Sequence, residues 1–193
     1  TALGVASTTD RLGNLIATFD GTGPSVMLFA HMDQLGFVIR KIEPDGFLRL
    51  ERLGGVPERA LPAQEGLICG AEGRDIHGII AHKSHHATGP DEKYTTLKTH
   101  DLYVDAGFEN AEEAAEAGVK IGSPVVYAPG SYTIGEHRLC GPAVDDRAAC
   151  AVLLDVARDL ANRTSGPTVH MVFTVQEEFN LRGAQVAAQT LQP

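Results

Sequence analysis

Two runs of the chain, residues 25–30 and 168–175, consist mainly of apolar and β-branched side chains. Such runs are typical of strands buried on both faces of a parallel sheet. Residues 12–19 follow a turn-like segment and are predicted as another strand. Apolar side chains between Ala149 and Leu160 recur every three or four positions, which predicts an amphipathic helix. With a further helix expected from about Asn180, these elements indicate an α/β layer.

The pattern changes at residue 36, where short apolar runs alternate with Gly and Pro as far as about residue 137. Regular short strands with turn residues between them predict a small barrel or sandwich. One helix is expected inside this module, capped by Asn110 and closed by Gly118. We therefore divide the chain into an α/β part at residues 1–35, a β-rich insertion at 36–137, and a second α/β part at 138–193.

Titratable side chains follow the ends of the predicted α/β elements. His31 and Asp33 come after the first buried run, and Glu177 and Glu178 come after the second. In α/β sheets, ligands bind beside the carboxyl ends of strands. A histidine can bind a metal through one ring nitrogen while a carboxylate accepts from the other. The alternative is an ordinary polar pair in a loop.

The two other acidic pairs also allow two interpretations. Asp145 and Asp146 precede the amphipathic helix, where they could cap it, or where a carboxylate could bridge two cations. Adjacent side chains in extended backbone point in opposite directions. One of Glu177 and Glu178 could then bind metal while the other acts as a general base, or both could belong to a solvated loop. Three separate ends of strands or helices each carry a group that can bind a metal, and this combination favours a metal site.

Composition narrows the function classes. The 193 residues include 43% hydrophobic and 6% aromatic side chains and no Trp, and the formal net charge is −9. An acidic chain with few aromatic rings predicts no nucleic-acid partner. No apolar run approaches the roughly 20 residues of a membrane span, so we expect no membrane association. Three cysteines without a C-x-x-C pair suggest reduced thiols in a cytoplasmic protein.

Three segments resemble signatures of one family of dinuclear metallo-aminopeptidases, the tetrahedral, deblocking and glutamyl aminopeptidases. They are His31-Met-Asp-Gln-Leu-Gly-Phe37, Gly141-Pro-Ala-Val-Asp-Asp-Arg-Ala-Ala149 and Thr174-Val-Gln-Glu-Glu-Phe-Asn-Leu-Arg-Gly-Ala184. Weaker similarities lie between them in the same order, so the resemblance covers nearly the whole chain. Gln34 and Asn180 depart from the family pattern and lie close to the expected site.

The resemblance implies a zinc-aminopeptidase-like sheet with helices, interrupted by a β-barrel-like dimerisation domain. It implies two divalent metal ions per subunit, Zn or Co, with His31 on one metal, Asp145 bridging and Glu178 on the other. By the same resemblance, Glu177 is the general base and Asp33 orients His31. The remaining two ligands would lie outside this sequence, which resembles an interior fragment of a longer polypeptide.

The resulting expectation is a metal-dependent aminopeptidase that hydrolyses N-terminal residues from short peptides. Self-association to a dimer or larger assembly, a dodecamer by resemblance, is also expected. One alternative is a catalytically silent oligomerisation module or degraded homologue of the same fold. Another is a metallohydrolase of a different substrate class, since some family members carry an endoglucanase label. A glycosidase needs two carboxylates set across a sugar bond, and the mixed His and carboxylate set suits amide hydrolysis better.

Overall fold

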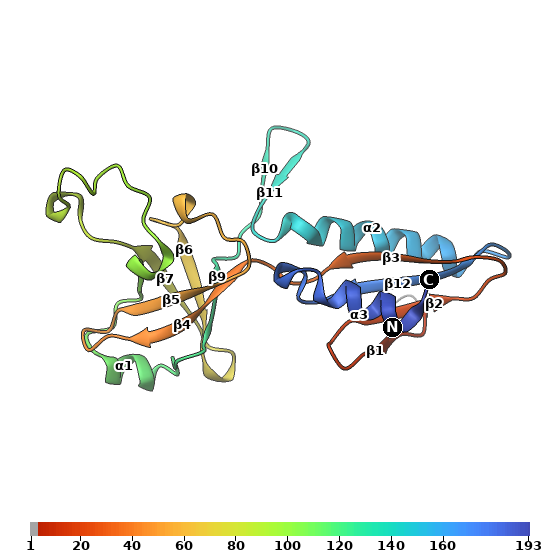
Figure 1. Ribbon diagram of the computed structural model, residues 1–193, viewed down its shortest axis with the longest axis horizontal. Coiled ribbons are helices and arrows are strands. Elements are labelled where there is room, and N and C mark those ends of the chain that lie inside the picture. The colour runs from red at the N-terminus through yellow and green to blue at the C-terminus, as the bar shows by residue number, and fades with distance from the viewer. Residues whose placement is uncertain (1–3) are drawn as a thin grey trace. The chain divides into compact units, whose positions relative to one another are not determined.

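The computed structural model describes residues 4–193 and divides into two compact units (Figure 1). Unit 1 combines Thr1–Gln34 with Ala143–Pro193, and unit 2 is Leu35–Pro142. The sequence pattern placed the second boundary after His137. The structure places it after Pro142, because a short hairpin of β10 (Tyr132–Ile134) and β11 (Arg138–Cys140) spans the predicted position.

Unit 1 contains a four-stranded sheet in which β12 is the strand that connects distant parts of the chain. β12 pairs parallel with β3 and antiparallel with β2. Consequently β3 and β12 end at the same edge of the sheet, where His31 pairs with Thr174. The strands, in spatial order, are β1 (Thr8–Thr9), β2 (Leu15–Phe19), β12 (Thr168–Thr174) and β3 (Ser25–His31).

Two helices accompany this sheet: α2 (Val144–Ala161) packs on β3 and β12, and α3 (Arg182–Leu191) contacts β12 (Figure 1). The apolar side of α2 is centred on Leu153 and Ala157, which are buried against the sheet. Val152, which the periodicity placed on that side, is 61% exposed because it lies on the flank of the buried stripe. The core of unit 1 comprises Ala17, Phe19, Ala30, Leu153, Ala157, Val169, Met171 and Phe173.

The expectation that residues 25–30 are buried on both faces is wrong for β3. Val26, Leu28 and Phe29 are between 37% and 47% exposed. Their exposure follows from the position of β3 at the end of the sheet formed by residues 4–193. By contrast, β12 lies between two strands, and Val172 is completely buried.

Unit 2 is a closed six-stranded barrel, which confirms the predicted α/β fold interrupted by a β-rich module. Its interior is filled by aliphatic side chains such as Ile39, Leu50, Ile68 and Val125. The strands, in order around the barrel, are β4 (Gly36–Ile42), β5 (Leu48–Leu53), β8 (Tyr103–Asp105), β7 (Asp75–Ala81), β6 (Glu65–Cys69) and β9 (Pro124–Tyr127).

The single helix of unit 2, α1 (Ala111–Glu116), begins where the sequence predicts. The side chain of Asn110 accepts a hydrogen bond from the backbone N–H of Glu113 at 2.8 Å, which satisfies one free donor of the first turn. Four 3₁₀ turns also belong to unit 2: Glu58–Ala60, Ala71–Gly73, His85–Ala87 and Thr99–Asp101. Across residues 4–193, no helix is long and apolar enough to cross a bilayer.

Candidate active site

The carboxyl edge of the sheet in unit 1 brings His31 and Asp145 together. His31 ends β3 and is 7% exposed, whereas Asp145 lies at the start of α2. The Nε2 atom of His31 is 3.2 Å from Oδ1 of Asp145. The Asp145 side chain is 95% exposed and has non-helical dihedral angles, so it does not act as an ordinary first-turn residue of the helix.

The other ring nitrogen of His31 fixes the tautomer. Nδ1 lies 3.0 Å from the backbone carbonyl oxygen of Asp33, and a carbonyl can only accept, so Nδ1 carries the proton. Nε2 faces Oδ1 of Asp145, and a carboxylate oxygen can also only accept, so these two atoms are hydrogen-bonded when Nε2 carries a proton as well. We expected the Asp33 carboxylate to orient His31. In the structure its nearer oxygen is 3.7 Å from Nδ1, and the carbonyl of the same residue takes that position.

Two α2 residues that the sequence did not single out for this purpose hold the backbone of His31. The carboxylate of Asp146 accepts the His31 N–H at 3.4 Å, and the thiol of Cys150 donates to the His31 carbonyl at 3.2 Å. Both contacts join residues more than a hundred positions apart along the chain. The Asp-Asp pair was a visible signal for Asp146, whereas nothing in the local pattern around Cys150 indicated its contact.

Glu177 and Glu178 do not lie on extended backbone, so the predicted reason for their divergence is wrong. They form a 3₁₀ turn, Glu177–Phe179, between left-handed residues at Gln176 and Asn180. The carboxylate of Asp33 stabilises this turn, since one oxygen accepts the Glu177 N–H at 3.1 Å and the other accepts the Glu178 N–H at 3.2 Å. Asp33 therefore links the first strand end to the second.

Negative charge accumulates around His31. Oε2 of Glu177 lies 3.7 Å from His31 Nε2. Burial alone would lower the pKa of His31, but the Asp33 carbonyl and the carboxylates of Glu177, Asp145 and Asp33 raise it overall. The pKa of Glu178 is raised, chiefly by burial and further by the negative charges of Glu177, Asp33 and Asp145. The charge of His31 opposes this increase. Such a cluster of acidic groups is electrostatically suited to cations.

Comparison with known proteins identifies the family. The sequence profile of the M42 glutamyl aminopeptidases matches residues 13–193. The chain belongs to the M42 glutamyl aminopeptidase family. It is 34% identical to the lysyl aminopeptidase of Pyrococcus furiosus over 184 residues, which are 95% of this chain and 53% of that enzyme.

Solved structures of relatives agree with the M42 assignment. A TET aminopeptidase from Thaumarchaeota archaeon SCGC AB-539-E09 matches with a TM-score of 0.91 and 34% identity, over 97% of this chain and 53% of that one. The Pyrococcus horikoshii TET1 peptidase matches with a TM-score of 0.85 and 30% identity, over 96% of this chain and 55% of that one. That peptidase is described as assembling into a tetrahedron or a large octahedral shell. This M42 chain spans about half the length of the curated relatives it matches.

The donor types at the edge of this M42 chain fit a divalent cation such as zinc. One imidazole and several carboxylates provide nitrogen and oxygen ligands, and the Nδ1–H of His31 is already bonded to a carbonyl, as metal-binding histidines usually are. Within residues 4–193, however, no three His, Cys, Asp or Glu side chains converge to hold a metal ion. The donors are arranged as the pairs His31–Asp145 and His31–Glu177.

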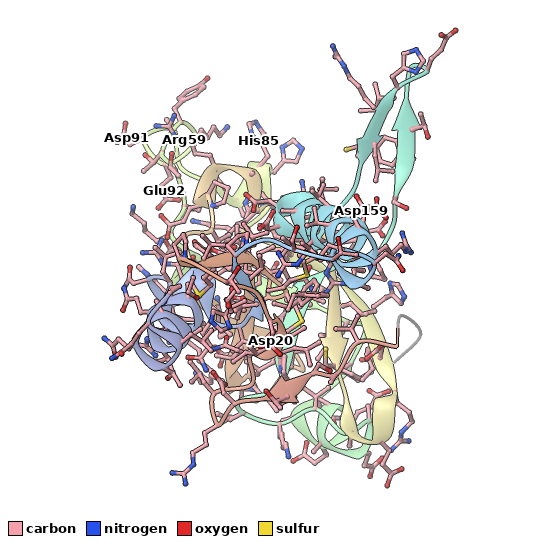
Figure 2. All side chains as sticks on the ribbon, turned by 90° about the vertical axis from the view of Figure 1, so that its right-hand side faces the viewer. Asp20, Arg59, His85, Asp91, Glu92 and Asp159 are labelled. Carbon is pink, nitrogen blue, oxygen red and sulfur yellow. The ribbon has the colours of Figure 1, made fainter. Side chains whose placement is uncertain are left out.

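Of the other histidines of the M42 chain, three form a local cluster in unit 2. His82, His85 and His86 are exposed in this unit. The side chains of Arg59, His85, Asp91 and Glu92, which are labelled in Figure 2, are among those that line a hollow of about 760 Å³. Two of its acidic side chains, Glu92 and Glu58, pair with Lys83 and Lys98, so the lining mixes acidic and basic groups and does not resemble a metal centre.

Proposed function

We propose that the full protein containing this chain is a metal-dependent aminopeptidase that removes N-terminal residues from short peptides. The observation that carries the proposal is the meeting of His31 and Asp145 at 3.2 Å, beside the Asp33-bound turn of Glu177 and Glu178. Membership of the M42 family supplies the reaction class. The substrates and partners proposed here belong to the whole protein.

The site would hold two divalent cations, with Zn and Co both suited to nitrogen and oxygen ligands. His31 would bind one cation, Glu178 the other, and the carboxylate of Asp145 would bridge them. Ligands outside residues 1–193 would complete the set. The bound cations would lower the pKa of water, polarise the scissile carbonyl and bind the free amino terminus of the peptide.

Glu177 is the general base in this proposal. Its carboxylate lies 3.7 Å from His31 Nε2, so it faces the space where ligands of His31 would be. A carboxylate there can take a proton from the attacking water and deliver it to the leaving amine. Asp33 contributes by fixing the backbone of Glu177 and Glu178, and its carbonyl fixes the ring of His31.

The decisive experiment is hydrolysis of a panel of chromogenic aminoacyl substrates by the full-length protein, before and after treatment with a chelator. The proposal expects turnover of unblocked aminoacyl substrates, loss of turnover with chelator, and recovery with added Zn or Co. Substrates with a blocked amino terminus are the control and should not be cleaved. No turnover of any unblocked substrate in the metal-loaded protein would refute the proposal.

The barrel of unit 2 is proposed as the self-association domain. Support comes from its closed core, which allows unit 2 to form a separate body, and from the assembly of the Pyrococcus horikoshii relative. We propose a dimer or a larger assembly, a dodecamer by resemblance to the family. Size measurement on the full-length protein tests this, and a monomer would contradict it.

A further inference from the structure

Asn14 is a fully buried polar residue that no part of the proposed chemistry uses. It comes directly before β2, and Leu15 of that strand pairs with Phe173 of β12. Since the two strands are antiparallel, Asn14 lies beside the end of β12, at the edge of the sheet where His31 and the Glu177 turn meet. Its amide is therefore at the edge of the sheet that carries the proposed site.

The amide of Asn14 joins both ends of the segment 176–182, which carries Glu177 and Glu178. Its Oδ1 accepts the backbone N–H of Val175 at 3.0 Å, and its Nδ2 donates to the carbonyl of Gly183 at 3.0 Å. The partners fix the orientation of the amide, because an N–H can only donate and a carbonyl can only accept. The segment between Val175 and Gly183 is thus closed at its base by one side chain.

Asp10 holds the amide in place. Oδ2 of Asp10 accepts the second N–H of Asn14 Nδ2 at 2.7 Å. Oδ1 of Asp10 accepts the backbone N–H groups of Leu12, Gly13 and Asn14, each at 2.9 Å. The turn before β2 therefore fixes both the backbone and the side chain of Asn14. A fixed amide can hold the segment 176–182 without a further entropic cost for that side chain.

Gly183 permits the close approach that this closure needs. A Cβ at Gly183 would lie 2.2 Å from the carbonyl oxygen of Val175 and 2.5 Å from Oδ1 of Asn14. The backbone N–H of Gly183 also donates to the Val175 carbonyl at 3.1 Å. The two ends of the segment are therefore packed backbone to backbone, with Asn14 against both.

The segment itself needs support from outside. Gln176, Asn180 and Leu181 have φ angles of 55°, 64° and 58°, in the left-handed region that side chains other than glycine rarely adopt. Such conformations persist only where surrounding contacts impose them. Asn14 supplies contacts at the base, and Asp33 supplies the contacts at Glu177 and Glu178.

We propose that Asn14 is a positioning residue of the active site, which acts by closing the base of segment 176–182 and thereby placing Glu177 and Glu178. The functional part of this inference rests on the proposed aminopeptidase activity. Catalytic groups must be held within about 0.5 Å of their productive positions. A displacement of about 1 Å can cost about a hundredfold in rate.

The test compares Asn14→Ala with Val169→Ala in the full-length, metal-loaded protein. Val169 is a matched control because it is 5% exposed in the same strand β12, but pairs with Phe19 and Val26 at the other end. Both variants should lower the thermal midpoint. Only Asn14→Ala should lower kcat, by about 10- to 100-fold at a temperature where both variants are folded. Only Asn14→Ala should weaken Zn retention against a competing chelator, through Glu178.

A second variant and a second readout keep the test decisive. Asn14→Ser keeps a short hydroxyl that can serve one of the two partners but cannot join both ends of the segment, so its kcat should fall between those of the wild type and Asn14→Ala. If Asn14→Ala does not fold, Asn14→Ser takes its place in every comparison. Hydrogen exchange at the amides of Glu177 and Glu178 should be faster in the Asn14 variants and unchanged in Val169→Ala.

The outcomes separate this inference from the proposed function. A folded Asn14 variant with kcat within about twofold of Val169→Ala overturns the positioning role. If the wild type shows no chelator-sensitive turnover, the aminopeptidase proposal fails. Hydrogen exchange at the amides then decides by itself whether Asn14 closes segment 176–182. Unchanged protection of Glu177 and Glu178 in the Asn14 variants would refute the closure, whereas faster exchange would support it.

Discussion

Nε2 of His31 lies 3.2 Å from Oδ1 of Asp145, although 114 positions along the chain separate the two residues. The whole barrel of unit 2 lies between them in sequence. Their contact depends on β3 ending at the edge of the sheet where α2 begins, with Asp146 and Cys150 of α2 holding the His31 backbone.

Removing the proposed bridging carboxylate should remove both cations. In full-length protein, Asp145→Ala should bind less than one metal ion per subunit, whereas His31→Ala should retain the cation bound by Glu178. Elemental analysis after dialysis measures both. Asp159→Asn is the matched control, since Asp159 is exposed on the same helix (Figure 2). Unchanged metal content in Asp145→Ala would exclude the bridging role.

The adjacent glutamates should have separable roles. Glu177→Gln should keep its metal and lose about 10²–10⁴-fold in kcat with KM little changed, because the amide cannot accept the proton. Glu178→Gln should lose metal affinity and recover part of its turnover in excess metal. Turnover and bound metal are measured together for both variants. Identical behaviour of the two would contradict the assignment.

Loss of the Asp33 carboxylate should disturb the Glu177 turn. Asp33→Ala leaves the N–H groups of Glu177 and Glu178 without their acceptor, while the Asp33 carbonyl that holds His31 stays in the backbone. We expect kcat to fall by about 10- to 100-fold. Asp20→Ala, at an exposed loop position of unit 1, is the control. Normal kcat in Asp33→Ala would show that the turn holds itself.

The stabilising effect of Asp10 should depend on pH. Burial alone would raise the pKa of Asp10, but the side chain of Asn14 and the backbone N–H groups of Asn14, Gly13 and Leu12 hold it below its ordinary value of 3.8. A lowered folded-state pKa means that the stabilisation is present above pH 3.8 and is lost as pH falls through the folded pKa. The difference in urea midpoint between wild type and Asp10→Asn should therefore shrink below pH 3.8. A difference that stays constant there would argue against a charge effect.

The assembly role of unit 2 can be tested by deletion. Replacing Leu35–Pro142 of the full-length protein by a short glycine-rich linker should leave a protein that no longer self-associates. Light scattering gives the mass of both forms, and circular dichroism shows whether the remainder is folded. A folded deletion variant that still assembles would place the interface in the rest of the protein.

Much of the architecture could be predicted from the sequence because the relevant signals are local. Short apolar runs between Gly and Pro indicated the strands of the barrel, a continuous apolar run indicated β12, and the spacing of apolar residues indicated α2. Frequent Gly and Pro residues between short apolar runs distinguished the barrel from the α/β part. The titratable residues at strand and helix ends were visible as motifs, since each motif occupies a few adjacent positions.

What only the tertiary structure decided are the contacts between these motifs. The register of β12 against β2 and β3 places Asn14 beside Val175 and His31 beside Thr174, and no local pattern encodes that register. The 3₁₀ turn at Glu177 is likewise set by distant acceptors on Asp33, which override the extended conformation expected there. Hydrophobic periodicity determines which elements form. The partners of buried polar groups depend on how those elements pair, because each such group must find its hydrogen bonds wherever the fold places it.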